Sequence, residues 1–259
     1  MPITLTTDFG ITDPYVGVMK GVIFGIAPAA NIIDITHAIE PQNIVQGAHI
    51  LEAAHRYFAE NTVHVAVVDP GVGTPRRAIA VEALEQRFVA PDNGILTPVL
   101  GPEAQVYELI EEKYFLSPRS STFHGRDIFA PAAAWIASGV ELSQMGPLIK
   151  DAKTLDLPEV SVKGQSLSGE IIHIDHFGNL VTNIPVHKIE EMFSGGKLFS
   201  IQLGEHKILG LVPSYAAGQP GKASGIINSW ERLEIFIPNG NAQAQLCRHL
   251  GQPVTLTVQ

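Results

Sequence analysis

Cysteine is almost absent from this sequence, in which Cys247 is the only one among 259 residues. A single cysteine cannot form an intrachain disulfide, and it cannot build a zinc site made of several cysteines. The N-terminus, Met1-Pro2-Ile3-Thr4, also lacks the basic residues followed by an apolar stretch that mark a secretory signal peptide. We therefore expect a cytoplasmic protein without disulfides.

Positive charge is scarce as well. The chain has 17 Lys and Arg against 26 Asp and Glu, which gives a formal net charge of −9 at pH 7. Binding to nucleic acid or to an anionic membrane needs clustered basic residues, so this balance argues against both partners. The longest apolar run, Tyr15 to Ile33, is interrupted by Lys20, Pro28 and Asn31, which favours a core helix and a strand over a membrane span.

Hydrophobic residues make up 45% of the chain, as in soluble globular enzymes with one large domain or two unequal ones. Over residues 1–150, short apolar strands alternate with segments of helical spacing. Strands buried on both faces are typical of parallel sheets covered by helices, so we predict an α/β domain with a mostly parallel sheet. The expected strands are Ile3–Thr7, Ile32–Thr36 and Val63–Val68, and the expected helices are Tyr15–Ile26, Ile44–Phe58 and about 128–138.

The pattern changes after this domain. Residues 151–164 carry scattered Pro, Lys and Asp, which predicts a linker. Residues 165–259 contain short strand signals separated by Gly and Pro, with one weak helical period around Val186–Phe193. This pattern favours a smaller all-β, barrel-like domain. Its expected strands are Ile171–Ile174, Leu198–Leu203, Lys207–Val212, Gly225–Asn228, Leu233–Ile237 and Val254–Val258.

Two predicted strands of the first domain end in an aspartate, Asp8 and Asp69. Ligands of open α/β sheets gather at the carboxyl ends of the strands, where an aspartate can accept hydrogen bonds from a ribose diol. Either residue alone is better explained as a helix cap or an Asx-turn, but two such strand ends in one sheet favour a site. The Pro- and Gly-containing loop after Asp69 can return Arg76 toward it, either for chemistry or as an ion pair that only pins the loop.

Two further clusters carry polar and aromatic side chains. His124 lies in Ser121–Asp127, and together with Asp69 and Arg76 it forms a set suited to handling a proton, although a loop histidine without such a role is the plainer interpretation. The segment Ile174–Asn183 combines a carboxylate, an aromatic ring and amides. It can bind a purine or an ammonium group, or it is a polar hairpin with Phe177 in the core.

Taken together, these segments resemble the S-adenosylmethionine hydroxide adenosyltransferases, a family related to the fluorinating and chlorinating adenosyltransferases. Six motifs in the family's order over almost the whole chain carry the resemblance. They are Thr6-Thr7-Asp8-Phe9-Gly10 with Asp13, Val68–Thr74 with Arg76, Ala90-Pro91-Asp92-Asn93-Gly94, Thr122–Asp127, Ile174–Asn179 and Asn228-Ser229-Trp230.

The resemblance implies hydrolysis of S-adenosylmethionine to adenosine and methionine, by attack of water on the ribose 5′ carbon and without a cofactor or metal. It also implies a homotrimer in which the N-terminal domain of one subunit faces the C-terminal domain of another. Asp69, Arg76 and His124 match the family's water-handling triad, and which of them is the base stays open. The substrate contacts that it implies are Asp8 and Asp13 at the ribose, Asp175 and Ser229 at the methionine end, and Phe177, Asn179, Tyr215, Glu231 and Ala242 around the adenine.

The same comparison argues against halide chemistry. The fluorinating relatives carry a tyrosine where Asp69 stands and a halide-binding serine where Gly125 stands. A carboxylate beside the reacting carbon repels a halide anion and can accept a proton from water, so hydroxide transfer is favoured.

Two rival functions remain open from the sequence. One is a metal-dependent phosphohydrolase, because carboxylates and imidazole suit Mg²⁺ or Mn²⁺, although Arg76 would oppose a cation. Its ligands would be Asp8, Asp13, Asp69, His124 and Asp175. The other is a non-catalytic sensor that binds adenosine or S-adenosylmethionine in the same pocket.

Overall fold

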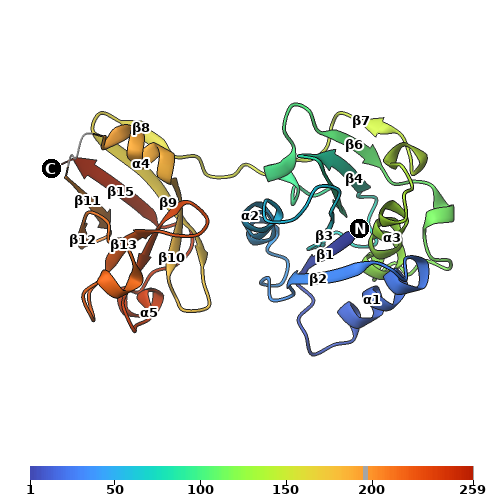
Figure 1. Ribbon diagram of the computed structural model, residues 1–259, viewed down its shortest axis with the longest axis horizontal. Helices are drawn as coiled ribbons and strands as arrows, with labels where there is room; N and C mark the ends of the chain where they lie inside the picture. The colour runs from blue at the N-terminus through green and yellow to red at the C-terminus, as the bar shows by residue number, and fades with distance from the viewer. Residues whose placement is uncertain (195–197, 259) are drawn as a thin grey trace. The chain divides into compact units, whose positions relative to one another are not determined.

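The computed structural model describes residues 1–194 and 198–258, and the chain forms two compact units, Met1–Asp156 and Leu157–Gln259 (Figure 1). The division falls within the segment 151–164, where the sequence predicts a linker. Residues 195–197 and 259, which belong to the range predicted for the barrel-like domain, lie outside the described residues. Each unit has its own core and is described by itself.

The first unit is built on a seven-stranded sheet with the order β2-β1-β3-β5-β4-β6-β7. Four neighbouring strands are parallel: β2 (Asn31–Thr36), β1 (Pro2–Thr7), β3 (Val63–Val67) and β5 (Gln86–Pro91). The remaining strands join them in antiparallel pairs: β4 (Ala78–Ala83), β6 (Gln105–Glu108) and β7 (Leu148–Ile149).

The prediction of a mostly parallel sheet is therefore wrong for β4, β6 and β7, and the sheet is mixed. Strands β4 and β5 form a hairpin with a two-residue turn, Leu84-Glu85, in which both residues have positive φ values of 53° and 59°. Such turns usually contain Asn or Gly, so Leu-Glu carries no turn signal in the sequence. A tight hairpin can only join antiparallel strands, so β4 runs opposite to β5, and the pairs beyond it are antiparallel as well.

Helices cover the sheet on both faces. In the fully buried strand β3, Val65 and Val67 pack in one core with the helices α1 (Tyr15–Ile26) and α3 (Ala130–Ala137). Ala66 and Val68 face the opposite core, with α2 (Ile44–His55). Single turns of 3₁₀ and π helix complete the unit: η1 (Thr97–Val99), η2 (Glu112–Tyr114), η3 (Gly125–Phe129) and η4 (Leu142–Gln144). The expected strands and helices are thus confirmed, with α2 ending one turn earlier than predicted.

The second unit is an antiparallel sheet that curls into a nearly closed, barrel-like form around one core (Figure 1). The strand order is β12-β11-β15-β9-β10-β14-β13, and β8 pairs with β9. Val212, just after β12, donates its N–H to the carbonyl of Gly225 in β13 at 2.8 Å, which ties the two ends of the sheet together. The predicted barrel-like architecture is confirmed.

The elements of this unit are short. Its strands are β8 (Ser161–Lys163), β9 (Ser166–Ile174), β10 (Leu180–Pro185), β11 (Phe199–Leu203), β12 (His206–Leu209), β13 (Ser224–Ile227), β14 (Arg232–Phe236) and β15 (Pro253–Val258). Its helices are α4 (Val186–Met192), η5 (Tyr215–Ala217) and α5 (Ala242–Leu246).

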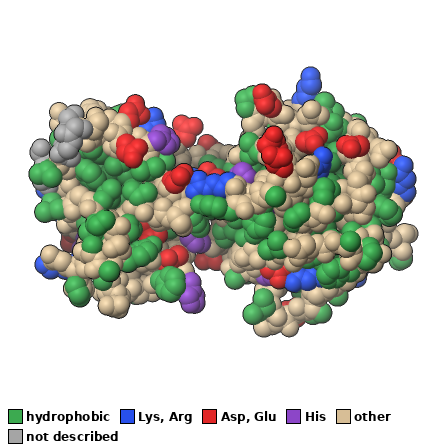
Figure 2. Space-filling view, viewed as in Figure 1, with side chains coloured by type: hydrophobic (Ala, Val, Ile, Leu, Met, Phe, Trp, Pro, Cys, Tyr) green, Lys and Arg blue, Asp and Glu red, His purple; other side chains and the backbone are tan. Residues whose placement is uncertain are grey.

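The surface carries charges of both signs. On the face drawn in Figure 2, Lys and Arg side chains lie scattered among acidic and apolar ones. Within the described part of the chain, no helix has the length and apolar character needed to cross a membrane.

Candidate functional site

Two aspartates lie at the same edge of the first sheet, as the sequence predicts. Strands β1 and β3 are parallel neighbours in which Thr7 pairs with Val67, so Asp8 and Asp69 follow strand ends at the same edge. Asp8 is partly exposed, and its Oδ2 accepts a hydrogen bond from the backbone N–H of Gln42 at 2.8 Å. Asp13 lies in the loop before α1 and is exposed.

The loop after β3 turns back sharply on itself. Val72 N–H donates to the Asp69 carbonyl at 3.2 Å and Thr74 N–H to the Gly71 carbonyl at 3.1 Å. Gly73 has a φ of +77°, and a Cβ on it would lie 2.3 Å from the carbonyl oxygen of Ser121. Only glycine permits this approach, which seats the loop against the segment that carries His124.

Asp69, Arg76 and His124 form one hydrogen-bonded group. Arg76 Nε lies 2.9 Å from Asp69 Oδ1 and 3.0 Å from Oδ2, and Nη2 bonds Oδ2 as well. The same Nη2 lies 2.8 Å from His124 Nδ1. Because the Asp69 and Arg76 side chains are only 5% and 7% exposed, these are buried, charge-assisted contacts. Arg76 also lies over the ring of Phe129, 5.1 Å from its centroid. The ion pair that fixes the loop and the predicted triad are therefore both present, because Arg76 bonds Asp69 and His124 together.

The contact with Arg76 fixes the protonation of His124. A guanidinium is always charged and can only donate, so Nδ1 of His124 must accept and the proton of the neutral ring is on Nε2. Burial lowers the pKa of His124, and the neighbouring Arg76 charge lowers that pKa further against the opposing effect of Asp69. The imidazole is therefore neutral at pH 7 and offers an N–H rather than a lone pair.

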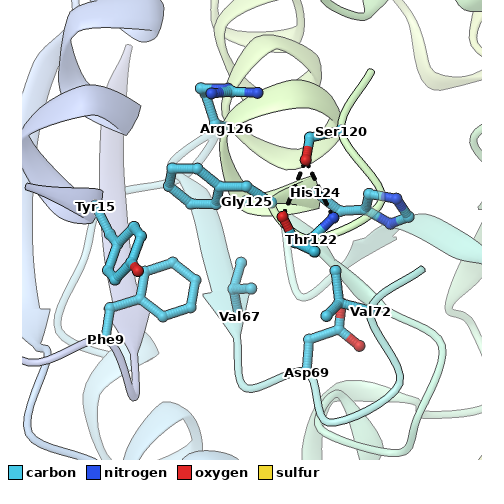
Figure 3. A pocket seen from close by; sticks show the side chains of 11 residues that line it. Phe9, Tyr15, Val67, Asp69, Val72, Ser120, Thr122, His124, Gly125 and Arg126 are labelled. Carbon is cyan, nitrogen blue, oxygen red and sulfur yellow. Dashed lines mark hydrogen bonds between the residues drawn. The ribbon is translucent and has the colours of Figure 1, made fainter.

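The group borders a cavity of about 390 Å³ (Figure 3). Phe9 and Tyr15 line one side, and Asp69 and His124 line the other. The rings of Phe9, Tyr15 and Phe123 meet edge to face, with centroids 5.2–5.9 Å apart. The remaining lining residues are Val67, Val72, Ser120, Thr122, Phe123, Gly125 and Arg126. A carboxylate, an imidazole and apolar aromatic rings thus line one cavity.

A second group of predicted residues is assembled within the C-terminal unit. Asp175 holds a tight turn, because its Oδ1 accepts the N–H groups of Phe177 at 2.9 Å and Asn179 at 2.8 Å, and its Oδ2 accepts from the Asn179 amide at 2.9 Å. Gly178, with a φ of +83°, accepts at its carbonyl the N–H of Gln243 at 2.8 Å, which joins this turn to the start of α5 at Ala242. Phe177 is 71% exposed, so the alternative that places it in the core is wrong.

Glu234 is the residue of this group that the sequence does not single out. It is 3% exposed, and it accepts hydrogen bonds from Tyr215 Oη at 2.8 Å and from Asn228 Nδ2 at 3.0 Å. Asn228 Oδ1 in turn accepts the N–H of Trp230 at 2.9 Å. This bond shapes the loop that contains Ser229 and Glu231. Burial raises the pKa of Glu234, and the Asp175 charge adds to that rise.

Glu234 could have been found from the pattern, since a glutamate between Leu233 and Ile235 in a strand of a small core demands polar partners. Glu231, the acid named from the sequence, is exposed. The two predicted groups therefore each contain hydrogen-bonded side chains, the triad in the first unit and the Asp175 and Glu234 clusters in the second.

Within the described part of the chain, no three His, Cys, Asp or Glu side chains form a group that could hold a metal ion. Asp69 instead directs both carboxylate oxygens at a guanidinium.

Comparison with known proteins gives consistent relatives. Residues 3–146 match the family model of the SAM hydroxide adenosyltransferase N-terminal domain, and residues 169–255 match that of the C-terminal domain. The (R)-S-adenosyl-L-methionine hydrolase of Thermus thermophilus is 35% identical over 98% of this chain and 99% of its own length. That of Salinispora arenicola is 42% identical over 69% of this chain and 70% of its own. A fluorinase of Actinoplanes is 30% identical over 88% and 87%. A solved structure of an uncharacterized conserved protein from Thermotoga maritima superposes with a TM-score of 0.92 at 35% identity, covering 99% of this chain and all of that one.

Proposed function

The chain belongs to the SAM hydroxide adenosyltransferase family, and on that premise we propose that it hydrolyses S-adenosyl-L-methionine to adenosine and L-methionine. Of the two configurations at the sulfonium sulfur, we propose that it takes the (R) form, which is the form named in four of its relatives. The single observation that carries the proposal is the Asp69–Arg76–His124 group on the wall of a cavity large enough for the reacting part of the substrate.

The reaction exchanges one bond at the ribose 5′ carbon. The oxygen of water forms a bond to C5′ while the C5′–S bond breaks, and its electron pair stays on sulfur as the neutral thioether of methionine. Because the leaving group is a sulfonium, it needs no acid, metal or cofactor to depart. Holding water in line with the C5′–S bond can supply roughly 7–11 kcal/mol of the barrier. The positive charge disperses along this path, so a pocket with apolar walls favours the transition state over the charged substrate.

Asp69 is the base in this scheme. His124 has no free lone pair, since Nδ1 accepts from Arg76 and Nε2 carries the proton. The Asp69 carboxylate retains lone pairs beyond those that face Arg76. As the C5′–O bond forms, the water oxygen becomes acidic and passes its proton to Asp69, a contribution of about 10²–10⁴-fold. Arg76 orients the carboxylate and stabilises hydroxide character, and the Nε2–H of His124 can hold the water oxygen.

The same wall argues against halide transfer. A halide would have to approach a carboxylate at Asp69, which repels it. The halide-binding serine of the fluorinating relatives is replaced by Gly125, where even a Cβ would lie 3.1 Å from the rings of Phe9 and Phe123. We therefore propose that water, not halide, is the nucleophile, although fluorinases are among the more distant relatives.

The rest of the substrate is assigned by the resemblance. We propose that Asp8, with Asp13 near it, binds the ribose hydroxyls and that Asp175 and Ser229 bind the amino acid end. Phe177, Asn179, Tyr215, Glu231 and Ala242 would surround the adenine, which suits the exposed rings of Phe177 and Tyr215, 71% and 49% exposed. Homotrimerisation, with each site shared between subunits, and a cytoplasmic location stay predictions of the sequence.

The test is hydrolysis in ¹⁸O-labelled water. The purified chain is incubated with each sulfonium epimer separately, and adenosine is analysed by mass spectrometry. We expect one ¹⁸O at the 5′ position, faster with the (R) epimer and unchanged by EDTA. Loss of activity in EDTA that Mg²⁺ or Mn²⁺ restores would favour the metal-dependent alternative. Calorimetric binding of substrate without any product would favour a sensor.

A further inference from the structure

The turn Asp92-Asn93-Gly94 directly follows β5 and has no part in the chemistry proposed above. It belongs to the motifs that carry the family resemblance, yet none of its residues is among the described residues that line the cavity. Strand β5 is the parallel neighbour of β3, so the turn lies at the same sheet edge as the end of β3, which leads to Asp69.

Asn93 holds the backbone immediately before Asp69. Its Nδ2 donates to the carbonyl of Val68 at 2.8 Å, and its Oδ1 accepts the N–H of Ile95 at 3.2 Å. Val68 is fully buried, so its carbonyl depends on such a partner. The Asn93 amide thus fixes the peptide from which Asp69 projects.

Asp92 holds the residue immediately after Arg76. Its side chain is buried, 1% exposed, and Oδ2 accepts from Arg77 Nε at 2.8 Å. Its N–H donates to the Arg77 carbonyl at 3.0 Å. That same carbonyl accepts from Arg76 Nη1 at 3.2 Å. The carbonyl of Arg77 therefore accepts hydrogen bonds from both the Asp92 backbone and the Arg76 guanidinium of the triad.

The turn is itself fastened on its other side. Asp92 Oδ1 accepts the N–H of Lys153 at 2.8 Å, and Thr97 Oγ1 accepts the N–H of Leu155 at 2.8 Å. Gly94 has a φ of +96°, and a Cβ there would lie 2.7 Å from Leu155 Cγ. With bonds on both sides and no room for a side chain at Gly94, the turn is a rigid support rather than a free loop.

We propose that Asp92 and Asn93 are positioning residues that set the geometry of Asp69 and Arg76 through the backbones of Val68 and Arg77. This role rests on the proposed function, because it concerns the alignment of the attacking water. In-line attack is sensitive to small displacements, and a shift of about 1 Å can lower a rate roughly 10²-fold.

The two ends of β5 offer a matched pair of variants. Asn93→Ala removes an amide that donates to a main-chain carbonyl at the carboxyl end. Gln86→Ala removes one at the other end, where Gln86 is 4% exposed and its Nε2 donates to the Phe58 carbonyl at 2.9 Å. We expect both variants to have a lower Tm. Only Asn93→Ala should lose kcat, about 10- to 100-fold with KM within about threefold.

Equal kcat in the two variants would overturn the proposal. If Asn93→Ala does not fold, Asp92→Asn serves instead, since it keeps its size and an oxygen for Lys153 but sets an amide N–H against Arg77 Nε. It should lose kcat in the same way, and a wild-type kcat would equally count against the role.

An NMR titration of His124 separates this proposal from the proposed function, because it needs no turnover. Because the Arg76 charge lowers the pKa of His124, loosening Arg76 in Asp92→Asn should move that pKa up toward its ordinary value, whereas Gln86→Ala should leave it unchanged. An unchanged titration overturns the positioning role. Absence of adenosine production by the wild-type chain overturns the proposed function alone.

Discussion

Arg76→Lys separates charge from geometry in the triad. The arginine uses three nitrogens: Nε on Asp69, Nη2 on both Asp69 and His124, and Nη1 on the Arg77 carbonyl. A lysine keeps the positive charge, but its single ammonium nitrogen cannot reach three separate partners. Lysine is preferable to alanine here, because alanine would leave a buried carboxylate unpaired at a cost of about 3–5 kcal/mol.

The size of the effect follows from the contacts that are lost. If the lysine retains Asp69, the hydrogen bond to His124 at 2.8 Å disappears. A hydrogen bond to a charged group contributes about 1.5–3 kcal/mol, and 1.36 kcal/mol corresponds to a tenfold change in rate. We therefore expect kcat to fall roughly 10- to 200-fold. KM should stay within about threefold, because Arg76 contacts the proposed base and not the residues proposed to bind the ends of the substrate.

The measurement is the initial rate of methionine release at saturating substrate, with Arg87→Lys as the control. Arg87 lies in β5 and bonds Asn61 Oδ1 at 2.7 Å and Glu82 Oε1 at 3.1 Å, so the control makes the same replacement in another ion pair. Its kcat should match that of the wild type. If Arg76→Lys also keeps kcat within threefold of the wild type, the fork geometry is irrelevant and only the charge acts.

Three further outcomes are expected. Because burial and Arg76 lower the pKa of His124, kcat should fall on the acid side with a midpoint below pH 6.5, and a midpoint at or above 6.5 in a pH–rate profile would refute the neutral imidazole. Burial lowers the pKa of His64 to about 4, so the stability that its neutral form contributes is complete above pH 6.5 and is lost as the pH falls through 4. We expect a loss of about 3 kcal/mol in the free energy of unfolding, measured by urea titration. The loss should be absent in His64→Phe. Glu234→Leu should raise KM about 3- to 10-fold at unchanged kcat, since Tyr215 and Asn228 each lose an acceptor. Glu234→Gln should stay near the wild-type KM. Equal KM values for the two variants in steady-state assays would contradict this.

The first half of the sheet could be predicted because its signals are local. Strand β3 is apolar on both faces, and α1 and α2 show helical spacing, so hydrophobic pattern and structure agree. The hairpin of β4 and β5 could not be predicted in the same way. Its turn uses Leu84 and Glu85 in left-handed conformations, which the strand pairing imposes against their intrinsic preference.

The triad could be predicted as a set of residues but not as a bonded geometry. The strand ends and the loop glycines indicate that Asp69 and Arg76 approach each other, whereas His124 is 48 residues beyond Arg76 and its contact depends on Gly73 packing against Ser121. Glu234 was missed because a motif draws attention to the loop at Ser229 and Glu231, while the residue that holds this loop lies inside the next strand. The fold determines such long-range partners. The sequence shows only a charged residue within an otherwise apolar strand.

Arg76 gives this triad a different order from a relay in which a histidine takes the proton and an acid supports the histidine. Here the guanidinium lies between the other two groups and bonds both, so Nδ1 of His124 accepts from Arg76, and in the proposed reaction Asp69 is the base. Such an arrangement suits a substrate whose leaving group needs no proton. In an acyl transfer, the base must return its proton to the leaving group, which favours a histidine. With a sulfonium, the proton of water only has to be removed, and a carboxylate fixed by an arginine can do this, while we propose that the neutral imidazole holds the water oxygen in line.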